Sequence, residues 1–211
     1  MLYAAGSVRD VSVDAEDLCG LTWLGQFLWF ADALREQVVA VDPYSAATVQ
    51  TLACPGLRVG LATYGGHLVY VAGPDLRLHV VDPGTGAQVD RFDNPRPGQV
   101  CTGLEGGRSG LWLGYPGRLE LRSPADLALV TTVELPGVPT GVAVTDRYLI
   151  CSNRWDESIT IVDPVLEQAV LPINVHGAPT GLAWDGTRIW YCDSAHSRLR
   201  AIDVPGLVRS G

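Results

Sequence analysis

Residues 179–186 read Pro-Thr-Gly-Leu-Ala-Trp-Asp-Gly, a short apolar segment that runs into a turn signal. The same kind of glycine-plus-apolar pair opens four earlier segments: Gly20-Leu21, Gly60-Leu61, Gly103-Leu104 and Gly141-Val142. The steps between successive pairs, ending at Gly181-Leu182, are 40, 43, 38 and 40 residues. A repeat of about 40 residues made of short strands is typical of a β-propeller blade.

A second marker keeps the same period as the glycine pairs. It falls at Asp42-Pro43, Asp82-Pro83, Ser123-Pro124, Asp163-Pro164 and Asp203. Asp caps its own backbone and proline presets φ, so each marker predicts a turn. In the first unit the expected strands are 20–23, 27–31, 38–41 and 48–52. The predicted fold is all-β, a five-bladed β-propeller of four-stranded antiparallel blades.

One domain is expected over residues 1–211. Its blades lie at approximately 20–58, 59–98, 102–138, 140–178 and 180–211 plus 1–18. After Asp203 only eight residues remain, which are too few for a further turn and a good outer strand. Residues 8–13 precede the first glycine pair at about the distance that an outer strand does elsewhere. We therefore predict that this N-terminal strand completes the fifth blade.

The charge balance and cysteine usage restrict the partners and the location. Acidic residues outnumber basic ones by 23 to 15 and the formal net charge is −8, whereas phosphate contacts require Lys or Arg. We expect no nucleic-acid partner and no membrane partner, and the longest apolar stretch, 18–31, is too short to span a bilayer. The N-terminus lacks the pattern of a secretory signal, and five cysteines without CxxC spacing favour free thiols. These features predict a cytoplasmic protein.

The sequence resembles a known superfamily of propellers. Pro139-Thr140-Gly141-Val142-Ala143 and residues 179–186 look like blades of NHL, YVTN, SMP-30-like and streptogramin-lyase-like proteins. The five-blade count and Gly20-Leu21-Thr22-Trp23 are also similar to glutaminyl cyclotransferases. The resemblance covers nearly the whole chain and implies the fold, while activity stays open because these families differ in their loops.

The resemblance also implies where a ligand would bind. If the strands of a blade are named A to D from the axis outward, this is the face of the D–A and B–C loops, over the mouth of the central channel. Loops on this face carry the candidate ligand-binding residues: Asp32, Arg35, Tyr115, Asn153, Arg154, Trp155 and Asp193. The loop 153–157 departs most from its siblings, because Trp155 is an apolar residue among charges and can anchor a partner. Two alternatives stay open: Trp155 covers a blade edge, and the arginine that recurs after strand B forms a salt bridge to the neighbouring blade.

Three residues are candidates for catalysis: Glu105, His176 and His196. The second residue after the glycine of strand A is Thr22, Ala62, Glu105, Ala143 or Ala183 in the successive blades. Small residues suit the crowded axis, so a carboxylate there would be desolvated, which raises its pKa and suits a general acid or base. The alternative is that Glu105 bonds adjacent backbone or turns into channel water. His176 and His196, with Asp193 or Glu157, could move a proton or bind a metal.

No cofactor is predicted, because HxH, HExxH and EF-hand patterns are missing. A divalent ion, Ca or Mg, stays open as an alternative through the resemblance to SMP-30-like enzymes, which Asn153 and Asp193 match only in part. Two functions remain: a module that binds a small molecule or protein segment over the channel mouth, or a lyase, cyclase or hydrolase acting in a pocket there. A third is a purely architectural domain. Trp29, Trp112 and Trp190 share one register of strand B and are expected in the core between blades.

Overall fold

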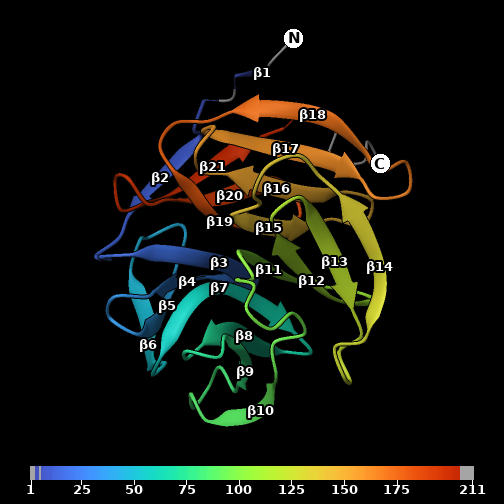
Figure 1. Cartoon of the computed structure of the whole chain (residues 1–211). Coiled ribbons are helices and arrows are strands. Elements are labelled where there is room, and N and C mark those ends of the chain that lie inside the picture. Colours follow the sequence, from blue (N-terminus) through green and yellow to red (C-terminus); the bar gives the residue numbers. More distant parts are fainter. Residues whose placement is uncertain (1–2, 5, 205–211) are drawn as a thin grey trace.

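The computed structural model describes residues 3–4 and 6–204, and this part of the chain forms strands and no helix. The strands make five sheets arranged around one axis (Figure 1). Within each blade, neighbouring strands are antiparallel and the first strand lies nearest the axis. The predicted five-bladed propeller is confirmed.

The blades follow one another along the chain. Blade 1 contains β3 (Leu18–Leu24), β4 (Phe27–Asp32), β5 (Gln37–Val41) and β6 (Thr48–Ala53). Blade 2 contains β7 (Leu57–Tyr64), β8 (His67–Ala72), β9 (Arg77–Val81) and β10 (Gln88–Phe92). Blade 3 contains β11 (Gly103–Gly107), β12 (Gly110–Tyr115), β13 (Arg118–Arg122) and β14 (Leu129–Glu134). Blade 4 contains β15 (Gly141–Val144), β16 (Leu149–Asn153), β17 (Ser158–Asp163) and β18 (Gln168–Asn174).

Blade 5 is assembled from both ends of the described chain. It contains β19 (Pro179–Trp184), β20 (Arg188–Asp193), β21 (Arg198–Asp203) and β2 (Arg9–Ser12). The outer strand β2 pairs antiparallel with β21, from Arg9 opposite Ala201 to Ser12 opposite Arg198. The predicted closure by the N-terminal strand is therefore confirmed. A further short strand, β1 (Tyr3–Ala4), pairs in parallel with β18 at the outer edge of blade 4.

The core lies between the blades. Five clusters of buried apolar side chains each join two adjacent blades, because alternate residues of a strand face opposite sides of its sheet. Trp29, Trp112 and Trp190 are all buried, which confirms their expected place. All five cysteines are free, as predicted, and all five are buried.

The glycines that open strand A are required by the close approach of blades at the axis. A Cβ on Gly20 would lie 2.5 Å from the backbone nitrogen of Leu61 in blade 2. A Cβ on Gly181 would lie 2.6 Å from the backbone nitrogen of Leu21 in blade 1. No side chain fits at these distances, so the packing at the axis explains the glycine marker of the repeat.

Hydroxyl groups at the mouth of the axis tie neighbouring blades together. Thr140 Oγ1 donates to the carbonyl oxygen of Pro179 at 2.7 Å, and Thr180 Oγ1 donates to that of Leu18 at 2.6 Å. Thr102 makes the equivalent bond to Pro139. The axial cavity lined by these threonines and the Gly–Leu pairs has a volume of ≈ 0 Å³. The axis is therefore closed at this level.

No helix in the described ranges, 3–4 and 6–204, is long and apolar enough to cross a membrane.

Candidate functional site

Each blade turns one side of its sheet toward the preceding blade, and we call the space between them the seam of that blade. In blade 3 the seam face consists of Leu111, Leu113, Tyr115, Arg118, Glu120 and Arg122. In blade 4 it includes Cys151, Asn153, Ser158, Thr160 and Val162. Residues directly opposite in an antiparallel pair share a face, so Glu120 in blade 3 and Thr160 in blade 4 occupy equivalent positions.

The blade-4 seam contains a pocket of ≈ 250 Å³. One wall is the D–A loop that arrives from blade 3, residues 135–139, and the other wall is formed by β16 and β17. Ser158 and Thr160 belong to this wall, and within the described chain their hydroxyl groups form no hydrogen bond. The pocket thus offers free donors and acceptors beside an apolar surface, which is the usual composition of a ligand site.

The charge of this pocket is negative. Glu134, Asp156 and Glu167 are among the lining residues, and no Lys or Arg lines it. Asp156 accepts a hydrogen bond from the amide nitrogen of Asn153 at 2.5 Å, while the other two carboxylates form no ion pair in the described chain. A neutral or cationic group therefore fits this environment better than an anion.

The loop 153–157 forms the rim of the pocket. Trp155 is 65% exposed, and the Arg154 guanidinium carbon lies 5.6 Å from the centre of its indole ring. The alternative that Trp155 covers a blade edge is not favoured by this exposure. The backbone of this loop matches that of the corresponding loops in other blades. Glu157 has φ +47°, and the equivalent residues Glu36, Leu76 and Ser197 have φ of +50°, +54° and +50°. The loop therefore differs from the others in its side chains.

Cys151 supplies the only sulfur among the residues that line this pocket. It is 6% exposed, and burial raises the pKa of its thiol to about 12. The thiolate is the reactive form of cysteine. Cys151 is therefore a small apolar wall residue at neutral pH and not a nucleophile.

Glu105 lies at the axis, on the far side of the glycine level from the loop face. It is 8% exposed, and the equivalent residues Thr22, Ala62, Ala143 and Ala183 are buried as well. Its carboxylate accepts a hydrogen bond from the Gly106 amide at 2.8 Å and lies 3.3 Å from Thr22 Oγ1 in blade 1. Burial raises the pKa of Glu105 to about 8, although these hydrogen bonds oppose the change. The expected desolvation of this carboxylate is present.

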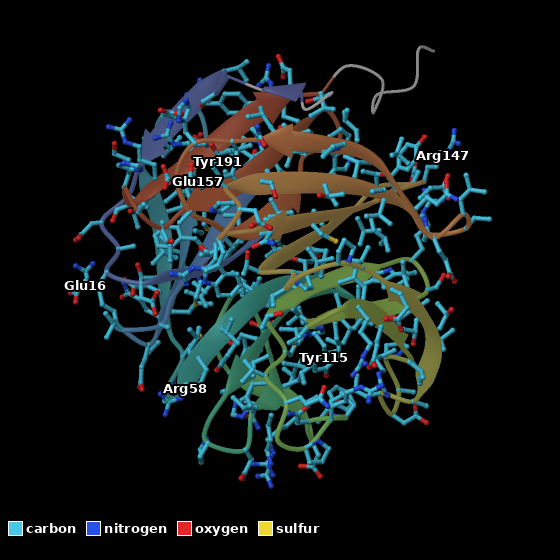
Figure 2. The ribbon with its side chains drawn as sticks, turned by 45° about the horizontal axis from the view of Figure 1, so that its top comes forward. Glu16, Arg58, Tyr115, Arg147, Glu157 and Tyr191 are labelled. Carbon is cyan, nitrogen blue, oxygen red and sulfur yellow. The ribbon has the colours of Figure 1, made fainter. Side chains whose placement is uncertain are left out.

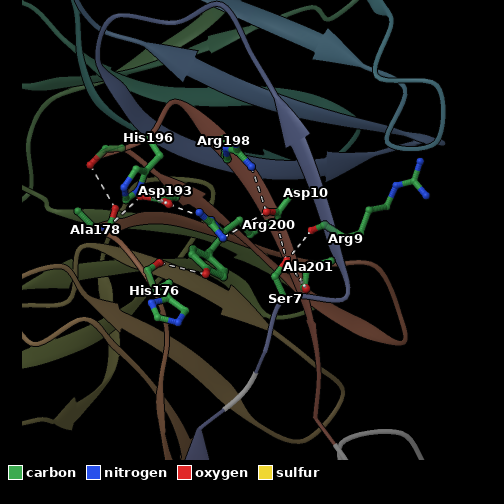
Figure 3. A network of polar contacts seen from close by, with 12 residues as sticks. Ser7, Arg9, Asp10, His176, Ala178, Asp193, His196, Arg198, Arg200 and Ala201 are labelled. Atoms are coloured by element: carbon green, nitrogen blue, oxygen red, sulfur yellow. Dashed lines mark hydrogen bonds and ion pairs between the residues drawn. The ribbon is translucent and has the colours of Figure 1, made fainter.

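His176 and His196 both lie at blade 5, away from Glu105. Asp193 is fully buried and binds His196 Nδ1 at 2.8 Å and Arg200 Nε at 2.8 Å. Arg200 also contacts Asp10 on the closing strand β2 at 3.2 Å (Figure 3). The backbone carbonyl of His176 accepts a hydrogen bond from Tyr191. The Arg200–Asp10 contact joins the N-terminal strand to blade 5, and none of these contacts involves Glu105.

Asp32 and Arg35 organise the loop that leads into blade 1. The buried Asp32 carboxylate accepts hydrogen bonds from the amides of Glu16 and Asp17, both at 3.0 Å. Arg35 forms ion pairs with Asp14 at 2.8 Å and Glu16 at 3.0 Å. The hydrogen bond and the charge of Arg35 lower the pKa of Asp14. Asp14 and Glu16 belong to the loop that joins β2 of blade 5 to β3 of blade 1, so Arg35 fixes this connection, whereas Arg118 and Arg198 pair with acids of their own blades.

Tyr115 is a predicted ligand-binding residue, and it lies in the blade-3 seam beside a charged cluster that the sequence analysis does not predict. Glu120 is fully buried and contacts Arg96, Arg118 and Arg122. The repeat contains a signal for this cluster. The positions equivalent to Arg122 in the other blades are occupied by apolar residues: Val41, Val81, Val162 and Ile202. A charge at a position that is otherwise apolar requires a buried partner.

In the described ranges, no three His, Cys, Asp or Glu side chains are grouped so that they could hold a metal ion.

The structure is similar to that of glutaminyl cyclase from Myxococcus xanthus. The TM-score is 0.79 at 15% sequence identity, with 94% of this chain and 95% of that chain covered. Virginiamycin B lyase from Staphylococcus aureus is also similar, with a TM-score of 0.54, 12% identity, and 88% and 65% of the two chains covered. A chain of a mitotic checkpoint complex matches with a TM-score of 0.61, 13% identity, and coverage of 96% and 93%.

No protein-family model and no curated relative matches the sequence. The structural similarities confirm the resemblance to propellers of the glutaminyl cyclase and streptogramin lyase type at the level of the fold. At sequence identities this low, structural similarity indicates a shared arrangement of strands but not a shared active-site chemistry.

Proposed function

We propose that this propeller is a binding module that holds a neutral or cationic group of a small molecule or protein segment in the blade-4 seam pocket. The observation that carries the proposal is the open pocket of ≈ 250 Å³, which is lined by Asn153 and Asp156 of the loop that carries the exposed Trp155. The closed axis supports the same choice, because a cavity of ≈ 0 Å³ offers no room to a ligand there.

The chemistry of the pocket selects the class of ligand. Ser158 and Thr160 supply hydroxyl groups, and Asp156 and Glu167 supply negative charge. An amine, guanidine or amide donates hydrogen bonds to such groups, whereas a carboxylic acid would be repelled. Trp155 then covers the bound group with an apolar surface, as aromatic residues do at many binding sites.

The test measures binding of small amines, guanidines and neutral amides by titration calorimetry, with matching carboxylic acids as the contrast. Trp155→Ala and the pocket-filling Thr160→Leu should each weaken binding about tenfold, the effect of losing roughly 1.4 kcal/mol. Leu34→Ala is the matched control, because Leu34 is equally exposed, at 68%, on the corresponding turn of blade 1. Equal weakening by Leu34→Ala, or no binding by any compound, would contradict the proposal.

A second candidate function is catalysis by Glu105. The specific observation in its favour is a buried carboxyl group whose pKa is raised to about 8, which suits an acid or base near neutral pH. Because the loop side of the axis is closed, a substrate would approach from the side of the A–B turns, where Thr63 and Gly106 are half-buried. The structural similarity to a glutaminyl cyclase makes cyclisation of an N-terminal glutamine the first reaction to assay.

Ammonia release from a glutamine-initiated peptide that disappears in Glu105→Gln would support this second candidate. Activity that survives in Glu105→Gln would remove Glu105 from it.

A further inference from the structure

The blade-3 seam carries a surplus of positive charge. The fully buried Glu120 carboxylate is contacted by Arg96 and Arg118 through Oε1 and by Arg122 through Oε2. Three guanidinium groups against one carboxylate leave a surplus of two positive charges, in a protein whose formal net charge is −8. Glu134 lies opposite Arg118 in the register of β13 and β14 but forms no ion pair in the described chain.

The blade-5 seam shows that such a surplus is not a general property of the repeat. There Arg198 and Arg200 face two carboxylates, Asp10 and Asp193. Charges in that seam are balanced, and every acid holds a strand or a turn in place. The two seams therefore differ in charge, because only the blade-3 seam places more arginines than carboxylates in one cluster.

A second, independent observation concerns Tyr115. This residue is fully buried, and its hydroxyl group has no hydrogen-bond partner. It lies opposite Arg118 in the register of β12 and β13, so both share the seam face. The Arg96 guanidinium carbon lies 6.0 Å from the centre of the Tyr115 ring. Figure 2 places Tyr115 within the body of the molecule, whereas Arg58 and Arg147 lie at its periphery.

The loop that carries Arg96 is held in a defined conformation. It runs from residue 93 to residue 102 and is the longest D–A loop between described strands. The buried Asn94 accepts from the Arg96 amide at 3.0 Å and donates to the carbonyl oxygen of Gln99 at 2.9 Å. Gln99 in turn accepts from Arg118 Nη2 at 3.2 Å. Both arginines are thus positioned in advance, which lowers the entropic cost of binding.

We propose that the blade-3 seam binds an oxyanion, the carboxylate or phosphate group of a small molecule, between Arg96, Arg118 and the Tyr115 hydroxyl. Arg96 contacts Glu120 through Nε and Nη2, and Arg118 contacts it through Nε while its Nη2 donates to Gln99. The two side chains remain 31% and 25% exposed. Their remaining N–H groups can donate to an anion from the solvent side, in the geometry that guanidinium groups favour. The Tyr115 hydroxyl would donate to the same anion and gain the partner that it lacks.

The test is titration with inorganic phosphate and, separately, with acetate and citrate, at low ionic strength. Saturable binding is expected, and whether phosphate or the carboxylates bind identifies the source of the oxyanion. Arg96→Lys and Tyr115→Phe should each weaken binding, Tyr115→Phe by about tenfold as for the loss of one hydrogen bond to a charged group. Tyr115→Phe is the decisive variant, since the hydroxyl has no partner whose loss would disturb the free protein.

Arg198→Ala serves as the control, because Arg198 belongs to the charge-balanced blade-5 seam and is similarly exposed, at 43%. Its affinity should equal that of the wild type. The absence of saturable binding, unchanged affinity in Tyr115→Phe, or equal weakening in Arg198→Ala would each overturn the proposal, since anions would then only screen surface charge.

Discussion

The seams of blades 3 and 4 use the same backbone positions for opposite purposes. In blade 3 the middle residue of the third strand is Glu120, which is fully buried beneath three arginines. In blade 4 the equivalent residue is Thr160, which lines an open pocket of ≈ 250 Å³. Charged side chains occupy the middle of one seam and an open pocket lies in the other, although the sheets around them are alike.

This difference separates what the repeat fixes from what it leaves free. Glycine at the start of strand A and the turn at the Asp-Pro marker are required by every blade, because they determine how sheets meet at the axis and reverse at the edge. Side chains in the seams satisfy a weaker condition: buried polar groups must find partners. The seams differ in how far they meet that condition, since Glu120 has three arginine partners while the Tyr115 hydroxyl has none.

The largest effect is expected from removing the charge that closes the blade-3 seam. Glu120→Gln leaves three guanidinium groups without their carboxylate, and we expect the free energy of unfolding to fall by about 4 kcal/mol. Thr160→Val at the equivalent position of blade 4 should change it by less than about 1 kcal/mol. Urea unfolding at pH 7 measures both. Similar losses in the two variants would show that the charges of the blade-3 seam are not what holds it closed.

The pH dependence of the blade-3 seam has a defined sign. Burial raises the pKa of Glu120, but hydrogen bonds from Arg96 and Arg122 outweigh it and hold the pKa below the ordinary value of 4.5. A carboxylate with a lowered pKa stabilises the fold above its unfolded pKa, and this contribution is lost as the pH falls through the folded value. Wild-type stability should therefore fall in acid, and Glu120→Gln should show less of this loss.

The sequence predicts the frame of the molecule more fully than its seams. Two markers in phase predict the five blades, the buried tryptophans and the closure of blade 5 by residues 8–13, because each follows from spacing and alternation alone. Within the candidate sites, comparison with sibling positions singles out Trp155 and Glu105 but leaves the surroundings of both side chains open. The partners of Glu120 do not, because Arg96 comes from a loop whose path the repeat does not determine.

A second buried glutamate in blade 3 provides the next prediction. Glu105 has no cationic partner in the described chain, and its pKa of about 8 lies above the ordinary 4.5. The folded state then binds more protons than the unfolded state between these two values, so stability is complete below pH 4.5 and is lost as the pH rises toward 8. The loss at pH 7 corresponds to about 3 kcal/mol. Glu105→Gln should remove this dependence and stabilise the protein at pH 7.

Unfolding curves from pH 5 to pH 9 measure this effect. The Glu120 contribution changes only below pH 4.5, so Glu120→Gln should keep the Glu105 slope over this range and serves as the control. A wild-type stability that is flat over this range would contradict the assignment, because it would mean that a cation or water stabilises the charged form of Glu105.

The smallest change in unfolding free energy is expected for two tyrosines that both face the preceding blade. Tyr191 in blade 5 donates to the carbonyl oxygen of His176 at 3.1 Å, whereas Tyr115 in blade 3 has no partner. Tyr191→Phe should therefore cost about 1 kcal/mol of unfolding free energy, the net value of one hydrogen bond. Tyr115→Phe should be neutral or slightly stabilising in the absence of an anion, since it removes a buried hydroxyl that lacks a partner.

Thermal unfolding at low ionic strength, with and without phosphate, measures both tyrosine variants. If the blade-3 seam binds this anion, phosphate should stabilise the wild type and Tyr191→Phe and should stabilise Tyr115→Phe less. A clear loss of stability in anion-free Tyr115→Phe would show that the hydroxyl already has a partner in solution. The positive surplus around Glu120 would then be a device for closing the seam and not for binding.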